Sequence, residues 1–300
     1  MVRLAVASRA ETCERIRGPL GDRGIDVGAI LARERTFVLD DGSTVDGVSP
    51  PDRSAVDLDA FDVGYVFPGR LVEGGVVDAL LSVPWVNDRE AVLRSRNKAE
   101  TIARLQAAGV PVPETVLVSN PVDDKTALAV FERFDDPVVV KPTTATRGKG
   151  VVRVDDPDSF RGVVDYLDVI HEDRTTRDRS YLVQEYLSEA TDYRAMVLDG
   201  EFVGAVRRSM PDDEQTEGRW KHNVHRGADA EGVDLPAELR RLAERAAAAM
   251  DVRLLGVDLL VTDGRAVVVE TNARPTIDDA EKYEDDFYDR FARLIRKTAV

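Results

Sequence analysis

Three side chains near the end of the chain have the types and spacing of a metal site. Asp258 lies within the apolar run 254–261, and Glu270 and Asn272 lie two residues apart in the run 266–272. Because side chains alternate faces along a strand, Glu270 and Asn272 share one face. Carboxylate and amide oxygens suit Mg²⁺ that is bound together with phosphates. If the two runs form a hairpin that gathers all three residues, the sequence predicts a Mg²⁺ site.

The turn between the two runs decides whether Asp258 joins the other two residues. A two-residue turn at 263–264 alone would place Asp258 opposite Val269, on the wrong face. An odd-numbered loop or a β-bulge would restore Asp258 opposite Glu270. We expect Val268 to share the face of Glu270. The other face of the first strand is wholly apolar: Leu255, Val257, Leu259 and Val261. The alternative is a hairpin that carries ordinary exposed acids.

A segment in the middle of the chain has the composition of a phosphate-binding loop. A predicted buried strand from Val138 to Lys141 leads into a small polar loop that ends Arg147-Gly148-Lys149-Gly150. Glycines let backbone N–H groups approach phosphate oxygens, and lysine supplies a positive charge. It is not a Walker loop, because Gly-Lys-Ser/Thr is missing and a strand follows. The alternative is an ordinary hairpin loop.

Composition limits the class of protein. The chain has 300 residues, is 43% hydrophobic and 32% charged, and carries a net charge of −15. This charge argues against nonspecific nucleic-acid binding, which depends on neutralising phosphates. Apolar runs of about 18 residues, which a transmembrane helix needs, are missing. The first residues are expected to form a strand and not a signal peptide. The single cysteine, Cys13, excludes an internal disulfide. A cytoplasmic enzyme fits these features.

The way in which the charge is built is a second compositional signal. The sequence has 7 lysines against 34 arginines, and paired aspartates recur in loop-like contexts. Acidic surfaces keep proteins of salt-loving organisms soluble, so the composition favours a halophilic origin. The alternative is a coding bias combined with an acidic surface.

The order of predicted elements indicates a small sheet followed by a larger α+β region. Residues 1–90 alternate short strands with helices, which implies a small open parallel sheet. A hairpin is expected at 37–48, turned at 41–42. A single helix is expected from Arg94 to Ala108. The later elements are expected as follows: strands 151–154 and 181–186, a helix 160–170, a hairpin 193–208, a polar loop 209–232, and helices 236–250 and 283–298.

Seven segments in order resemble the ATP-grasp superfamily, and within it the RimK-like amino-acid ligases. They are Arg96-Asn97-Lys98 opening a helix that leads to Pro113, Lys141-Pro142 with its glycine loop, Gln184-Glu185-Tyr186, Asp192-Tyr193-Arg194, the loop 219–227, Gly256-Val257-Asp258, and Glu270-Thr271-Asn272. The resemblance covers about residues 90–296. Each motif alone is a weak signal, whereas seven in the same order are specific.

The resemblance implies the fold and the ligands. It implies an N-terminal pre-ATP-grasp βαβ domain at 1–90, a central ATP-grasp subdomain at 91–180 and a C-terminal subdomain with the metal site at 181–300. ATP would lie between the two subdomains. The implied ATP-binding residues are Lys98, Lys141, Arg147, Gly148, Lys149, Gly150, Gln184, Glu185, Tyr186, Leu187, Asp192 and Lys221. Within this set, 184–187 would contact adenine through backbone groups and Asp192 would hold the ribose. One or two Mg²⁺ (or Mn²⁺) ions would bind Asp258, Glu270 and Asn272.

The resemblance also implies a reaction. A substrate carboxylate would attack the γ-phosphate of ATP to form an acyl phosphate and ADP, and an amine would then displace phosphate and form an amide or peptide bond. Arg194, Arg208 and Asn223 are the candidate catalytic residues, because guanidinium and amide groups suit phosphate oxygens. Glutamate is a candidate for the added amino acid. The partners are therefore a small-molecule or peptide carboxylate and an amine. Whether the chain forms a homo-oligomer stays open.

Two departures from the family pattern bear on the substrate. In the loop 219–227, Lys221-His222 replaces Arg-Ser, although His225 and Arg226 match the pattern. After Asn272, RimK-like ligases often have Ala-Ser-Pro-Gly, whereas this chain has Arg274 in place of the serine. We expect Arg274, with His225 and Arg226, to contact an acidic small molecule or a peptide terminus. The alternative functions are an ATP-grasp kinase and a non-catalytic ATP-binding regulatory protein.

Overall fold

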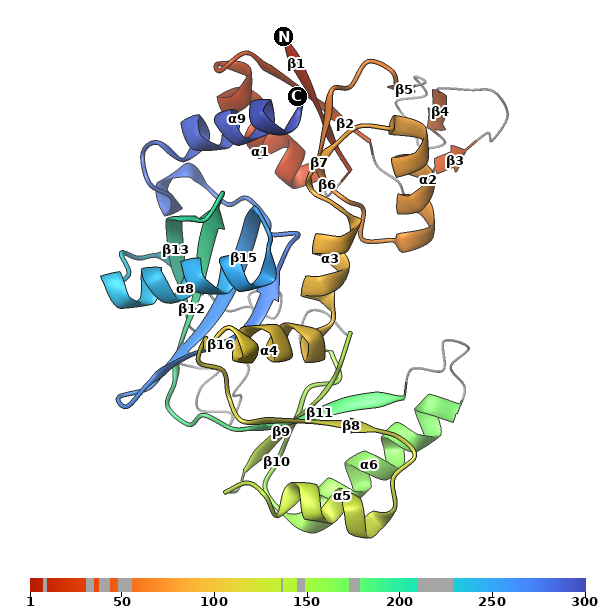
Figure 1. Cartoon of the computed structure of the whole chain (residues 1–300), viewed down its shortest axis with the longest axis vertical. Helices are drawn as coiled ribbons and strands as arrows, with labels where there is room; N and C mark the ends of the chain where they lie inside the picture. Colours follow the sequence, from red (N-terminus) through yellow and green to blue (C-terminus); the bar gives the residue numbers. More distant parts are fainter. Residues whose placement is uncertain are drawn as a thin grey trace.

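A computed structural model describes residues 1–7, 10–30, 35–37, 44–47, 56–135, 137–144, 149–172, 179–209 and 229–300. Three larger sheets follow one another down the long axis of the molecule (Figure 1). The N-terminal sheet is at the top of this view, the C-terminal sheet is in the middle and the central sheet is at the bottom.

The N-terminal sheet is parallel, as the sequence predicts. Its strands, in spatial order, are β2 (Ile25–Ala29), β1 (Val2–Val6), β6 (Val63–Val66) and β7 (Trp85–Asn87). Helices α1 (Ala10–Gly21) and α2 (Leu71–Leu81) connect these strands. A small antiparallel sheet contains β3 (Arg35–Phe37), β4 (Thr44–Gly47) and β5 (Val56–Asp57). The pairing of β3 with β4 confirms the expected hairpin, whose turn at 41–42 lies outside the described residues.

The single helix expected from Arg94 to Ala108 is wrong. The structure has two helices, α3 (Arg89–Arg96) and α4 (Lys98–Ala107), which meet at Asn97. Asn97 has an extended backbone, and its side chain accepts a hydrogen bond from the N–H of Glu100. An asparagine in this conformation is a favourable N-cap, so it begins a new helix instead of continuing the old one. Lys98 is therefore the first residue of α4.

The central sheet is antiparallel and has helices on one face. Its strands, in spatial order, are β10 (Val152–Val154), β9 (Val138–Pro142), β11 (Ser180–Glu185) and β8 (Thr115–Ser119). Helices α5 (Asp124–Phe131) and α6 (Pro157–Glu172) bury Phe131 and Phe160 against Val138, Val140 and Val183. Because side chains alternate along a strand, Lys141 and Gln184 lie on the opposite face. The sequence made no prediction for β8 or α5.

The C-terminal sheet is also antiparallel. Its strands, in spatial order, are β14 (Asp229–Gly232), β13 (Glu201–Ser209), β12 (Thr191–Leu198), β15 (Leu254–Val261) and β16 (Ala266–Asn272). Helix α8 (Ala237–Met250) packs on one face of this sheet. Strand β14 corrects the expected polar loop at 209–232, because its residues pair with the end of β13. The chain then passes through the 3₁₀ helix η2 (Ala280–Lys282) and ends in α9 (Phe287–Thr298), beside α1 (Figure 1).

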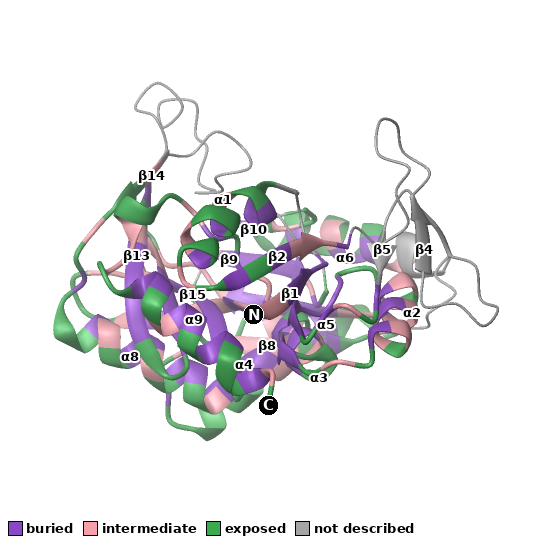
Figure 2. Ribbon diagram, turned by 90° about the horizontal axis from the view of Figure 1, so that it is seen from above, coloured by how far each residue is buried: buried purple, intermediate pink, exposed green. Residues whose placement is uncertain are grey.

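The buried strands form two separate cores. One apolar cluster runs continuously from the N-terminal sheet into the C-terminal sheet, and a second lies between the central sheet and its helices. Figure 2 shows the buried strands at the centre of the molecule, with exposed helix faces around them. In the described residues, every helix is too short or too polar to cross a bilayer.

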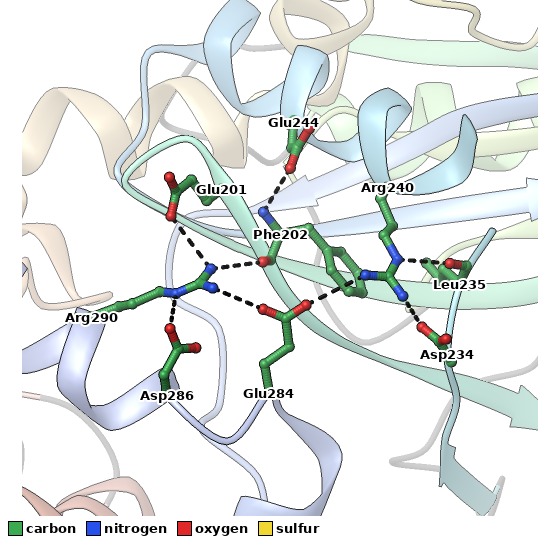
Figure 3. Close-up of polar contacts among 9 residues, drawn as sticks. All are labelled: Glu201, Phe202, Asp234, Leu235, Arg240, Glu244, Glu284, Asp286 and Arg290. Atoms are coloured by element: carbon green, nitrogen blue, oxygen red, sulfur yellow. Dashed lines mark hydrogen bonds and ion pairs between the residues drawn. The ribbon is translucent and has the colours of Figure 1, made fainter. Parts of the chain in front are cut away.

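A network of ion pairs fastens β13, α8 and α9 together on the outside of the molecule (Figure 3). Glu284 lies between Arg240 and Arg290, with N–O distances of 3.5 and 3.2 Å. Arg290 also pairs with Asp286 at 2.8 Å, and the guanidinium of Arg240 lies 5.0 Å from the centre of the Phe202 ring. Single surface ion pairs contribute little to stability, whereas a network of several charges contributes more. We assign this cluster a structural role.

Candidate active site

A β-bulge in the β15–β16 hairpin decides which side chains share the face of Asp258. Leu259 pairs with Val268, and Asp258 pairs with Glu270, so Val269 is the extra residue. The hairpin also has the tight turn at 263–264, because the N–H of the preceding Thr262 donates to the residue that follows the turn. The bulge thus restores the pairing that this turn alone would have lost. It also corrects the expectation for Val268, which pairs with Leu259 and is fully buried.

The bulge places three charged residues side by side across three strands. Arg194 on β12 pairs with Asp258 on β15, and Asp258 pairs with Glu270 on β16. Asn272 lies opposite Gly256, two residues further along the same pair of strands. The predicted gathering of Asp258, Glu270 and Asn272 on one face is therefore present. The face of the C-terminal sheet opposite α8 thus carries the two acids and Arg194.

Asp258 is held by two guanidinium groups. Arg194 donates to both carboxylate oxygens, from Nε at 2.6 Å and from Nη2 at 2.8 Å, and Nη2 of Arg208 lies 3.2 Å from Oδ2. Burial disfavours the charge of Asp258, but the two guanidinium groups outweigh burial and lower its pKa. Asp258 is therefore ionised at neutral pH.

Asp192, the residue implied for the ribose, lies directly opposite Arg208 on the neighbouring strand. Nη2 and Nε of Arg208 donate to its Oδ1 at 2.5 and 3.0 Å, and both side chains are about nine-tenths buried. Burial raises the pKa of Asp192 to about 7, an effect that Arg208 opposes and the charge of Asp258 reinforces. The side chain of Arg194, in contrast, is one-third exposed. Arg194 is thus the better placed of the two arginines to contact a substrate.

Lys98 connects α4 to the acidic face, which is the face of the C-terminal sheet that carries Asp258 and Glu270. Its Nζ donates to Oε1 of Glu270 over 2.7 Å, and its backbone N–H donates to the oxygen of Thr143. Thr143 follows β9, so this backbone bond brings the start of α4 beside the central sheet. Lys98 therefore approaches the site from α4.

Lys141 extends from the face of the central sheet opposite α5 and α6. Its Nζ donates to Oε1 of Gln184 over 2.8 Å. Burial lowers the pKa of Lys141 to about 8, a shift that Glu270 opposes and the charge of Lys98 increases. Glu270 and Lys98 influence Lys141 because the faces of the two sheets lie near each other across the site.

The expected adenine-binding segment leaves β11 and turns toward the C-terminal sheet. Within this segment, the N–H groups of Glu185 and Tyr186 donate to main-chain oxygens of Glu114 and Pro137. Adenine contacts through those two N–H groups would require breaking these bonds, so the carbonyl groups and Leu187 are the better candidates. The side chain of Gln184 is committed to Lys141.

Arg274 is fixed at both its backbone and its side chain. Its N–H donates to Oδ1 of Asn272 over 2.9 Å, and its Nη1 donates to the oxygen of Phe67 in the N-terminal sheet region. The segment that follows β16, the strand of Glu270, is thus bound to the end of β6. Arg274, which departs from the family pattern, lies between the N-terminal sheet and the candidate metal ligands.

The remaining candidates divide between described and undescribed residues. Lys149 and Gly150 are exposed at the far end of the glycine loop, and Gly150 has a φ of +72°, which favours glycine. The others lie outside the described residues: Arg147, Gly148, Lys221, Asn223, His225 and Arg226. Their assignments stay predictions.

The residues present fit a divalent cation that binds together with phosphate. Asp258, Glu270 and Asn272 supply hard oxygen atoms from one face, and an amide oxygen that accepts one N–H has a second lone pair. The described residues contain no group of three or more His, Cys, Asp or Glu side chains that could hold a metal ion. Mg²⁺ prefers a ligand set with few carboxylates, which phosphate oxygens complete.

The family model for a RimK-like ATP-grasp domain matches residues 95–291. The chain belongs to the RimK-like ATP-grasp family. A relative from Legionella pneumophila, named a probable alpha-L-glutamate ligase, is 32% identical over 199 residues. A relative from Picosynechococcus with the same name is 33% identical over 198 residues. These alignments cover 66% and 65% of this chain, and 61% of each relative, so the chain matches less than two thirds of their length.

Solved structures show that the whole chain has the ATP-grasp fold of this family. A D-cycloserine synthetase superposes with a TM-score of 0.72 at 18% identity and covers 100% of both chains. A RimK domain ATP-grasp protein from Sphaerobacter thermophilus has a TM-score of 0.61 at 20% identity and covers 99% of this chain and 98% of its own. The expected combination of a parallel N-terminal sheet and an ATP-grasp fold is confirmed.

Two residues that position this RimK-like site were missed in the sequence. Thr115 bonds to Gln184, and Asn87 bonds to the backbone at both Leu254 and Ala273. The stretch after Pro113 has β-branched residues that could have predicted β8, and with it a strand residue beside Gln184. Asn87 gives no comparable signal, because its partners are distant in sequence.

Proposed function

We propose that the protein is an ATP-dependent carboxylate–amine ligase that forms an amide or peptide bond. The main observation is the side-by-side arrangement of Arg194, Asp258 and Glu270, with Lys98 bonded to Glu270 and Lys141 nearby. This combination of hard oxygen ligands and cations suits a phosphoryl group in transfer. The names of the Legionella and Picosynechococcus relatives support the same reaction class and make glutamate the first amino acid to test.

The proposed reaction has two steps. A substrate carboxylate oxygen attacks the γ-phosphorus of ATP, and the bond to the β-phosphate oxygen breaks to release ADP. The amine nitrogen then attacks the acyl carbon, the bond from that carbon to the phosphate oxygen breaks, and the amine loses a proton. The residues in the site act by position and charge, so the reaction needs no protein nucleophile.

The structure supports different roles for the cationic residues. Lys98 and Lys141 would contact the phosphates of ATP, since Lys98 bonds to Glu270 and Lys141 is close enough to Glu270 and Lys98 for their charges to affect its pKa. Arg194 would contact the acyl phosphate, because its side chain is one-third exposed. Arg208 would position Asp258 and Asp192, because it is buried and bonded to both. Asn223 is retained as a candidate from the family resemblance alone.

Asp258, Glu270 and Asn272 would hold one or two Mg²⁺ or Mn²⁺ ions. When bound, such an ion neutralises charge that develops on the phosphate oxygens during transfer. Asn272 would be oriented for this by the N–H of Arg274. Asp192 would reach the ribose only if its pairing with Arg208 rearranged.

Arg274 is the proposed contact for an acidic substrate, together with His225 and Arg226 from the resemblance. Its planar guanidinium can pair with a carboxylate through two parallel hydrogen bonds. The bond to Phe67 holds this guanidinium in place. A substrate with a non-reacting carboxylate would therefore be preferred.

The test is ADP release from Mg·ATP at high KCl, screened over carboxylates and amino acids, with mass spectrometry of the products. We expect ADP and phosphate only when both a carboxylate and an amine are present. ADP release with a stable phosphorylated product and no amine requirement would indicate a kinase. Nucleotide binding without turnover over the whole panel would indicate a regulatory protein.

A further inference from the structure

A chain of three hydrogen bonds ends at Lys141. The hydroxyl of Thr115 donates to the oxygen of Pro113 over 2.8 Å. Nε2 of Gln184 donates to Oγ1 of Thr115 over 2.7 Å, and Oε1 of Gln184 accepts from Nζ of Lys141 over 2.8 Å. The chain crosses from β8 to β11 to β9, which are neighbours in the central sheet.

The bond from Thr115 to Pro113 determines which group donates and which accepts in the other two hydrogen bonds of this series. A main-chain carbonyl can only accept, so the single hydroxyl proton of Thr115 points to Pro113. The oxygen of Thr115 can then only accept from Gln184. The amide group of Gln184 must therefore direct its NH₂ toward Thr115 and its oxygen toward Lys141. In the opposite orientation, the NH₂ group of Gln184 would face the ammonium of Lys141, and both groups are donors.

This orientation matters because Lys141 is buried and burial lowers its pKa to about 8. The charged groups that face it are Glu270 on β16 and Lys98 on α4, and they act in opposite directions. Gln184 and Thr115 contribute no charge, so their effect depends on which end of the amide is presented. A hydrogen bond from an ammonium to an amide oxygen stabilises the charged form, while a facing NH₂ group destabilises it.

We propose that Thr115 and Gln184 are positioning residues that orient and maintain the Lys141 ammonium for the phosphates of the nucleotide. This inference rests on the proposed function, because it requires the nucleotide to bind at Lys141. Thr115 acts only through Gln184 and contacts no substrate. The hydroxyl of one threonine on β8 thereby contributes to the upper pH limit of nucleotide binding.

The first test measures the affinity for Mg·ADP by calorimetry across about pH 6.5–9.5, a range that includes the titration of a buried lysine. The wild-type affinity should fall as the pH rises through about 8, where Lys141 loses its proton. In Thr115→Val, the fall should begin about one pH unit lower, which is roughly fivefold weaker binding at the wild-type midpoint and approaches about tenfold at higher pH. Thr115→Ser should restore the wild-type profile, because serine supplies the same hydroxyl.

Thr126→Val is the matched control. Thr126 is an exposed residue of α5, so the same loss of a hydroxyl there should leave the pH profile unchanged. A wild-type profile in Thr115→Val would overturn the inference. An equal loss of affinity at all pH values would also overturn it, since that result indicates a general structural defect and not a change at Lys141.

The second test removes the need for orientation. In Gln184→Glu, both side-chain oxygens can accept, so the midpoint should move to higher pH whichever oxygen faces Lys141. Adding Thr115→Val to Gln184→Glu should then produce little further shift. If Thr115→Val alone does not fold, an unshifted midpoint in Gln184→Glu still contradicts the inference. Absence of Mg·ADP binding by the wild type at every pH would contradict the proposed function instead.

Discussion

The guanidinium of Arg274 donates from Nη1 to the main-chain oxygen of Phe67 over 2.5 Å. This bond joins the segment after the acidic strand β16 to the carboxyl end of β6. Ligands of open parallel sheets commonly bind outside the carboxyl ends of the strands. Tyr65 and Asn87 add bonds to the main-chain oxygens of Pro275 and Ala273. The N-terminal sheet therefore fixes the position of the side chain that we propose for substrate selection.

Gly69→Ala should shift Arg274 without removing it. A Cβ at Gly69 would lie 3.0 Å from Nη1 and 3.1 Å from Cζ of Arg274, so the guanidinium would have to move by a few tenths of an ångström. We expect a severalfold increase in KM for an acidic substrate and an unchanged KM for ATP. Gly75→Ala in α2 is the control, because a Cβ there meets nothing within 4 Å. Steady-state kinetics with the substrate found in the screen would measure both values.

Arg274→Ala should remove the preference for an acidic substrate over its neutral amide. A hydrogen bond to a charged group contributes roughly 1.5–3 kcal/mol, so the ratio of kcat/KM values for the acid and the amide should fall about 10–100-fold. The matched pair is L-glutamate and L-glutamine, if glutamate is a substrate. An unchanged ratio, with normal ATP turnover, would rule out this role for Arg274.

Glu270→Gln and Asp258→Asn should both abolish turnover but should differ in stability. The side chain of Glu270 is 41% exposed, and its ion pair in the described part of the chain is with Lys98, whose side chain is 7% exposed, so we expect Glu270→Gln to fold with the smaller loss of stability. Asp258 is buried between Arg194 and Arg208, and removing one partner of a buried ion pair typically costs 3–5 kcal/mol. Chemical denaturation combined with ADP release would test the difference. Near-normal turnover in both variants would contradict the metal-ligand assignment.

Stability should rise with pH above about 8 because of Lys141. Its pKa is about 8 in the folded protein and 10.5 ordinarily, so between these values the unfolded chain binds more protons. Below pH 8 the folded state bears the full cost of burying the charge, and the cost is relieved as the pH rises toward 10.5. The size of the effect is about 3 kcal/mol. The free energy of unfolding of the wild type, relative to Lys141→Met, should therefore increase across this range, and a constant difference would count against the pKa shift.

Asn87→Ala should destabilise the junction between the N-terminal and C-terminal sheets. The buried amide of Asn87 donates to the oxygens of Leu254 and Ala273 at 2.6 and 2.8 Å, and it accepts from the N–H of Leu254. Each buried group left without a partner costs about 1–3 kcal/mol. We expect a loss of several kcal/mol in urea denaturation. Asn97→Ala, which removes one helix cap, should lose only about 1 kcal/mol, and equal losses would be unexpected.

Side-chain alternation was sufficient to place Glu270 and Asn272 on one face, because no irregularity separates them, but it misplaced Val268, which lies on the other side of the bulge. Whether an odd-numbered loop or a bulge would restore the pairing of Asp258 was left open. The bulge at Val269 depends on how the two strands twist and pack, which the sequence of the hairpin does not determine. The break at Asn97 had a local signal, since Asn97 and Glu100 have the spacing of a capping box.

Other parts of the site could not be predicted because they depend on contacts between distant segments. β14 has no strand pattern in its sequence and exists through its pairing with β13. Gln184 reaches Lys141 because of the register in which Leu182 pairs with Lys141, and register between distant strands is not written in either strand. The division of the chain at residues 90 and 180 stays a prediction.

Strand β16 is the last strand of its sheet, and such an edge can pair with a strand from another molecule. Here the N–H of Val268, next to the bulge, donates to the oxygen of Pro111 over 2.9 Å. The connection between α4 and β8 thus covers part of the edge, and the bulge interrupts the regular row of donors and acceptors beside it. The same irregularity that aligns Glu270 with Asp258 therefore also protects the protein against edge-to-edge aggregation.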